Sequence, residues 1–140
     1  MKRASTQTLA GAAAVCACAL APWMAQAQTP DLAPSMKSVG AARYACGGVG
    51  AEESNAMRAA MKNHPLSLLF ARESGAYLAD VQVTVTDSQG STALSMRADG
   101  PVCLVDLPAG RYTVAAASEG VTKSQVVSVG NGAKVADFRF

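Results

Sequence analysis

The chain has 140 residues, half of them hydrophobic, which is enough for one small domain. It carries 12 basic and 10 acidic residues, a formal net charge of +2 at pH 7. Without Lys2 and Arg3, at the very start of the chain, basic and acidic residues balance at 10 each, so there is no basic excess of the kind that nucleic-acid binding needs.

The first 27 residues have the three parts of a secretory signal peptide. Residues 1–8 are basic, residues 9–21 form an uninterrupted apolar run, and Ala25-Gln26-Ala27 is a small-x-small cleavage signal. The apolar run is shorter than the roughly 20 residues that a transmembrane helix needs. We therefore expect export, cleavage before Gln28 and no stable membrane insertion.

Two alternatives concern the same segment. In the first alternative, the apolar run is not removed and remains as an N-terminal anchor. In the second, Val15-Cys16-Ala17-Cys18 resembles the lipobox of bacterial lipoproteins, and a lipid on Cys18 would tether the protein to a membrane.

Cleavage leaves two cysteines, Cys46 and Cys103. Two thiols in a small exported domain most often form a disulfide, here worth about 3 to 4 kcal/mol by the chain-entropy estimate. The alternative is a metal site with His64 as third ligand. Metal sites usually contain closely spaced ligand pairs, whereas His64 lies 18 residues after Cys46 and 39 before Cys103. We expect the disulfide and no metal.

Residues 28–40 contain two prolines and no periodicity, which predicts a flexible linker. In residues 41–65 a short strand ends in glycines, and a helix-favouring segment follows up to His64-Pro65. Met57 and Met61 lie four residues apart and so share one face of this helix. We expect that face to pack on the body of the domain; the alternative is that it faces a partner protein.

Residues 66–140 alternate between strand patterns and turn signals. The clearest alternation runs from Val81 to Asp87, where valines alternate with polar residues. About seven short strands separated by turns predict a β-sandwich or barrel. Gly130-Asn131-Gly132 further predicts a hairpin between the last two strands.

The segment Leu107-Pro108-Ala109-Gly110 has the composition of a tight turn. Pro108 fixes its own φ, and Gly110 permits a positive φ. Leu107 is placed to fill the edge of the core, and Tyr112 begins the alternation of the next strand. We predict a corner of a β-sandwich.

This turn, within Asp106-Leu-Pro-Ala-Gly-Arg-Tyr-Thr-Val114, resembles the carboxypeptidase regulatory-like domain, one of the transthyretin-like (prealbumin-like) β-sandwiches. Residues 81–90, VQVTVTDSQG, resemble the strand and turn V-x-V-x-D-x-x-G of that family. The resemblance covers about residues 66–140. It implies a mainly β fold, a seven-stranded transthyretin-like Greek-key sandwich, preceded here by one short α-helix. Such domains are usually accessory modules that aid folding, docking or ligand presentation.

One transthyretin-like branch hydrolyses 5-hydroxyisourate with histidines, an arginine and a C-terminal Tyr-Arg-Gly-Ser. This chain has a single histidine, His64, and ends in Asp137-Phe138-Arg139-Phe140. The resemblance therefore implies no enzyme of that kind. We expect no catalytic residue and no cofactor.

Other chemistry-bearing residues fit structural roles. Glu52 and Glu53 are adjacent and suit the first turn of a helix. Residues 47–50, Gly-Gly-Val-Gly, lack the Lys-Ser/Thr of a phosphate loop. Four aspartates at turns would bind Ca²⁺ only if the fold gathered them, and no calcium-loop motif is present; they are Asp80, Asp87, Asp99 and Asp106.

The sequence predicts a non-enzymatic exported accessory or binding module, periplasmic in location, that contacts another protein of the bacterial envelope. It would act through strand addition at an exposed sheet edge or through its loop end. The alternative is a periplasmic small-molecule or carbohydrate-binding protein with a pocket between helix and sandwich.

Overall fold

The structure, a computed structural model, describes Gly11 and residues 34–140. The predicted cleavage site and Cys18 lie outside the described residues. The elements in chain order are β1 (Lys37–Val39), β2 (Ala42–Gly47), α1 (Ala51–Ala60), the 3₁₀ turn η1 (Met61–Asn63), β3 (Leu66–Ala71), β4 (Val81–Asp87), β5 (Thr92–Ala98), β6 (Val102–Asp106), β7 (Gly110–Ser118), β8 (Val121–Val129) and β9 (Lys134–Arg139).

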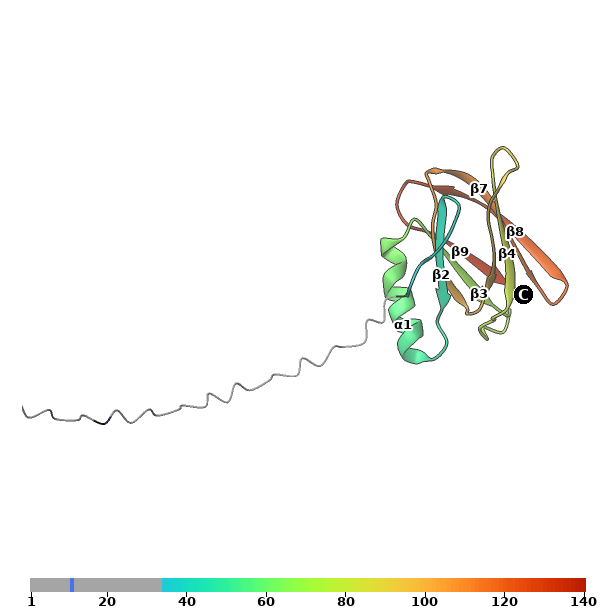
Figure 1. The fold of residues 1–140 in the computed structure, drawn as a ribbon. Helices are drawn as coiled ribbons and strands as arrows, with labels where there is room; N and C mark the ends of the chain where they lie inside the picture. The colour runs from blue at the N-terminus through green and yellow to red at the C-terminus, as the bar shows by residue number, and fades with distance from the viewer. Residues whose placement is uncertain (1–10, 12–33) are drawn as a thin grey trace, which may run out of the picture. The chain divides into compact units, whose positions relative to one another are not determined.

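The strands form two sheets that face one another (Figure 1). Sheet A has the order β1-β2-β6-β3-β9, and sheet B has the order β5-β4-β7-β8. Helix α1 lies along the outer side of sheet A. The predicted mainly β architecture with one short helix is confirmed.

The predicted number of strands is wrong, because the described residues contain nine strands rather than seven. Seven of them, β3 to β9, lie within residues 66–140. The other two join the same sandwich: β2 pairs antiparallel with β6, and β1 pairs with β2. Strand β1 lies within residues 28–40, for which the sequence predicts a linker. The sequence does not predict this strand because its three exposed residues show no alternation of apolar and polar side chains.

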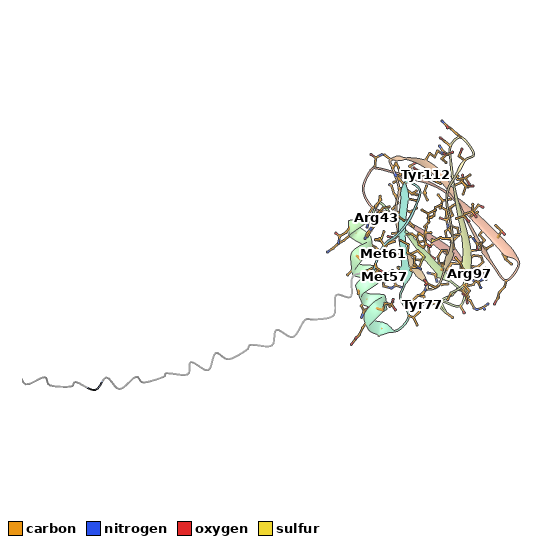
Figure 2. All side chains as sticks on the ribbon, in the orientation of Figure 1. Arg43, Met57, Met61, Tyr77, Arg97 and Tyr112 are labelled. Carbon is orange, nitrogen blue, oxygen red and sulfur yellow. A yellow bond between two sulfur atoms is a disulfide. The ribbon has the colours of Figure 1, made fainter. Side chains whose placement is uncertain are left out.

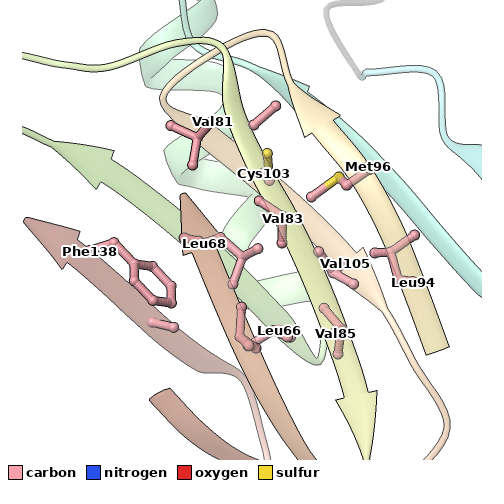
Figure 3. Close-up of a cluster of buried hydrophobic side chains, with 14 of the residues drawn as sticks. Leu66, Leu68, Val81, Val83, Val85, Leu94, Met96, Cys103, Val105 and Phe138 are labelled. Atoms are coloured by element: carbon pink, nitrogen blue, oxygen red, sulfur yellow. The ribbon is translucent and has the colours of Figure 1, made fainter. Parts of the chain in front are cut away.

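The core lies between the sheets and follows the alternation of side chains along each strand. Val81, Val83 and Val85 of β4 are fully buried, and they face Leu66 and Leu68 of β3 (Figure 3). This interleaving of inner faces fixes the register of β3 and β4, because a shift by one residue would turn every one of these side chains away from the core between the sheets.

The hairpin predicted at Gly130-Asn131-Gly132 is wrong. Strand β8 pairs with β7 in sheet B, whereas β9 pairs parallel with β3 in sheet A, so the chain crosses between the sheets at this turn. The crossing places Phe138 in the core, where its ring stacks on Phe70 with the centroids 5.8 Å apart. Burial of this aromatic pair outweighs the local turn preference.

The cysteines lie directly opposite one another on β2 and β6, and their sulfur atoms are 2.06 Å apart. The predicted Cys46–Cys103 disulfide is confirmed. It fastens the N-terminal strand to the middle of sheet A and closes a sequence separation of 57 residues. Its sulfurs face the core, where Cys46 lies 3.8 Å from the sulfur of Met96.

Helix α1 covers sheet A with its methionine face. Met57 is 1% exposed and packs on Val102 and Leu104 of β6, while Met61 is partly buried against the same cluster (Figure 2). The alternative that Met57 faces a partner is therefore wrong, because its side chain is buried against sheet A. Among the described residues, no helix is long and apolar enough to span a membrane.

Candidate interaction surfaces

The predicted corner joins β6 of sheet A to β7 of sheet B. Leu107 is buried in the core, and the Tyr112 hydroxyl donates a hydrogen bond of 2.7 Å to the Pro108 carbonyl. This is the geometry of a tyrosine corner. Gly110 does not have the positive φ that the sequence suggested; a Cβ there would instead meet the Tyr112 ring at 3.5 Å.

Burial raises the pKa of Tyr112, and the nearby negative charge of Asp87 raises it further. Asp87 is itself held in its own turn, where one carboxylate oxygen accepts the backbone N–H groups of Gln89 and Ser91 at 2.9 Å. The Tyr112 hydroxyl and the Asp87 carboxylate therefore both have partners inside the fold.

His64 lies at the junction of η1 and β3, and its Nδ1 is 2.6 Å from a carboxylate oxygen of Asp106. This half-buried pair connects the junction to β6. Among the described residues, no group of three histidine, cysteine or acidic side chains lies close enough to hold a metal. Three of the four aspartates have separate partners: Asp80 contacts Arg97, Asp87 accepts hydrogen bonds within its own turn, and Asp106 contacts His64.

The space between α1 and sheet A is filled by Met57, Val102 and Leu104. A ligand pocket between helix and sandwich, the alternative drawn from the sequence, would therefore have to lie beside this contact and not within it. In the described part of the chain, two hollows lie at the start of α1 and one lies beside η1. Another lies at one end of the sandwich, where Ala42 of sheet A and Tyr112 of sheet B line the same space.

Strand β8 is a nine-residue edge of sheet B, and no described strand pairs with its second side. Val121 and Ser118 flank the two-residue turn to β7, so they form the first hydrogen-bonded pair. Backbone polar groups of successive residues point to opposite sides of a strand. The N–H and C=O groups that point away from β7 therefore belong to Thr122, Ser124, Val126 and Ser128.

The β8 edge has few of the features that usually protect an edge. Natural edge strands are short, charged, bulged or interrupted by proline. β8 is long, contains no proline, and its single charged residue, Lys123, lies 5.9 Å from the Phe140 ring. The side chain of Val126 is 56% exposed on the outer face of sheet B. Among the described residues, β8 is therefore a long sheet edge with a free pairing side.

A second surface lies at the start of α1. Val49 is 67% exposed and Tyr77 is 56% exposed, and both line one hollow of about 250 Å³. In the sequence, residues 47–50 stand out only as a glycine-rich segment that lacks the phosphate-loop motif, and Tyr77 is not singled out. No local sequence pattern marks either residue as part of a surface, because Val49 and Tyr77 come together only in the folded chain.

The chain matches no known protein-family model, and no curated protein shows significant sequence similarity to it.

Proposed function

We propose that the protein is a non-enzymatic binding module, exported to the bacterial envelope, that holds a partner protein by strand addition at β8. The observation that carries the proposal is the free side of this nine-residue edge. A partner strand would pair with the outward N–H and C=O groups of the β8 edge. Val126, exposed on the outer face of sheet B, would add an apolar contact beside the new pairing.

Two further observations support parts of this proposal. The Cys46–Cys103 disulfide suits an oxidising compartment outside the cytoplasm. The turn at residues 106–114, on which the resemblance to carboxypeptidase regulatory-like domains rests, lies at a crossing between the two sheets. We propose membership of that transthyretin-like group, in which accessory roles are usual.

The test is purification of tagged protein from its own cell envelope at native expression, with quantitative mass spectrometry. Two variants change the edge: Ser124→Pro removes an outward N–H without removing a bond to β7, and Val126→Lys places a charge on it. Ser95→Lys, exposed on the opposite edge strand β5, is the matched control.

We expect a stoichiometric partner with the wild type and Ser95→Lys that is lost with both β8 variants. Thermal unfolding of all four proteins checks that the fold is intact. An equal yield of partner from all four would refute strand addition at β8. No enriched protein, with or without crosslinking, would refute the binding function itself.

Export has its own test, the mass of the N-terminus of protein recovered from the envelope. We expect a chain that begins at Gln28. A chain that retains residues 1–27, or one that carries a lipid on Cys18, would contradict the proposed cleavage.

A further inference from the structure

Two exposed apolar side chains, Val49 and Tyr77, lie together although they are distant in the sequence. Val49 precedes α1, and Tyr77 follows the turn after β3, yet they line the same hollow. The remaining lining residues are Gly48, Gly50, Leu78, Ala79 and Pro101. Figure 2 shows Tyr77 beside the beginning of α1, on the same side as Met57. An apolar hollow built from separate segments is a feature of the fold and not of one loop.

Tyr77 is held in place from two sides. Its backbone bridges to Ala71 at the end of β3, and the next residue, Leu78, donates a hydrogen bond of 3.1 Å to Phe70. Arg58 of α1 donates a hydrogen bond to the Tyr77 hydroxyl, and its guanidinium carbon lies 5.3 Å from the ring centroid. The ring is thus ordered before anything binds, which lowers the entropy lost on association.

The walls of the hollow depend on glycine. Gly48 has φ +95°, and a Cβ there would lie 3.1 Å from Val102. A Cβ on Gly100, in the turn before Pro101, would collide with the Gly47 carbonyl. These close approaches bring the two loops together beside Tyr77 and keep the hollow in one shape.

A second hollow of about 350 Å³ continues from the first and shares Val49 and Gly50 with it. Its other lining residues are Ala51, Glu52 and Glu53, the first turn of α1. The Glu53 carboxylate accepts the Val49 N–H at 3.2 Å, and Glu52 is exposed with no ion-pair partner among the described residues. The combined surface, the Val49–Tyr77 groove, therefore has an apolar half and an acidic half.

We infer that the Val49–Tyr77 groove binds a protein segment in which a large apolar side chain stands next to a lysine or arginine. The apolar side chain enters the hollow beside Tyr77, and the basic side chain faces Glu52. The apolar hollow, of about 250 Å³, offers space for one large apolar side chain, and the first turn of α1 lies directly beside it. Tyrosine and arginine are also the residue types that dominate binding energy at protein interfaces.

The groove is formed by other elements than the β8 edge, so this inference does not depend on strand addition there. It adds a second contact to the proposed binding function and states its chemistry. A partner that used both surfaces would gain affinity from their joint engagement.

The test selects random 12-residue peptides displayed on phage against immobilised protein produced from the full 140-residue sequence. The affinities of the selected peptides, made synthetically, are then measured by fluorescence anisotropy. We expect the peptides to share an aromatic or aliphatic residue beside a lysine or arginine. Tyr77→Ala and Val49→Ala should each weaken binding about tenfold. Val135→Ala, a change of an exposed valine on β9, and Ser124→Pro on β8 should leave it unchanged.

A charge exchange tests the acidic half. Glu52→Lys should weaken a peptide that carries lysine, and replacement of that lysine by glutamate in the peptide should restore binding to the Glu52→Lys protein. Peptides without an adjacent basic residue, no selected peptides, or an affinity unchanged by Tyr77→Ala would overturn the inference. Concentration-dependent dimerisation that Tyr77→Ala abolishes would assign the groove to a second copy of the chain and would equally overturn it.

Discussion

The hydroxyl of Tyr112 donates a hydrogen bond of 2.7 Å to the carbonyl of Pro108, four residues earlier and across the crossing from sheet A to sheet B. The bond gives the Pro108 carbonyl a hydrogen-bond partner in a turn between strands. It also fixes the direction in which β7 leaves the corner. Because β7 is a central strand of sheet B, between β4 and β8, the corner positions both of its neighbours.

Tyr112→Phe should lower the free energy of unfolding by about 1 kcal/mol, because the Pro108 carbonyl loses its partner while the ring keeps its packing. Urea unfolding at neutral pH measures the difference. Tyr44→Phe is the matched control, since Tyr44 is also partly buried against the core. Equal stability of Tyr112→Phe and wild type would show that water replaces the bond without cost.

Alkaline pH should destabilise the wild type through the same residue. Burial and Asp87 raise the pKa of Tyr112 in the folded protein, so the folded state keeps the phenolic proton to a higher pH than the unfolded chain does. The stabilisation is complete below the ordinary pKa of 10.0 and is lost as the pH rises through the higher folded value. Urea midpoints from pH 8 to 11 should therefore fall more steeply for the wild type than for Tyr112→Phe. Parallel curves would contradict this assignment.

Reduction of the Cys46–Cys103 disulfide should lower the free energy of unfolding by about 3 to 4 kcal/mol, because the unfolded chain is released from a loop of 57 residues. Urea unfolding with and without a reductant gives the change. Thiol labelling of unfolded, unreduced protein, followed by peptide mapping, should leave both cysteines unlabelled. A label on each would show that the bond does not form in the protein as produced.

Met57→Ala should destabilise the protein by about 2 to 4 kcal/mol, because it removes a buried side chain between α1 and β6 and leaves a cavity. Met61→Ala should cost clearly less, since Met61 is only partly buried at the end of the same face. Thermal and urea unfolding of the two variants compare them directly. Equal and small effects would mean that the helix does not depend on its contact with the sheet.

The sequence predicts those features that depend on neighbouring residues. The alternation of Val81, Val83 and Val85 marks a half-buried strand wherever it lies. The disulfide follows from having two cysteines after the expected cleavage. The helix is recognisable from its composition and from the proline that follows η1.

The features that the sequence does not predict depend on contacts between distant segments. Strand β9 leaves the expected hairpin because Phe138 gains burial beside Phe70, 68 residues earlier. Val49 and Tyr77 become one surface only after α1 is fixed on sheet A. Neither relationship has a local pattern, which is why the candidate groove could be found only in the fold.

In the turn between β7 and β8, Glu119 combines a strained backbone conformation with a surface ion pair, and the two effects on stability can be compared. Glu119 has φ +50°, and Gly120 has φ +81°, as the two positions of a tight hairpin turn require. The Glu119 carboxylate also accepts hydrogen bonds from Arg72 at 2.8 and 3.2 Å, and these bonds and the positive charge lower the pKa of Glu119. Glu119 thus has a backbone conformation that asparagine adopts more readily, and its side chain gains a contact with Arg72 in the turn after β3.

Because the pKa of Glu119 is lowered in the folded state, this contact stabilises the protein above the ordinary pKa of 4.5 and is lost as the pH falls below it. Both groups are exposed, so the effect should be small and should weaken with salt. Glu119→Gln and Glu119→Asn both remove the charge, and only asparagine also relieves the backbone. We therefore expect a higher urea midpoint for Glu119→Asn than for Glu119→Gln at pH 7 and at pH 3. If the two variants unfold together, the positive φ of Glu119 carries no measurable strain.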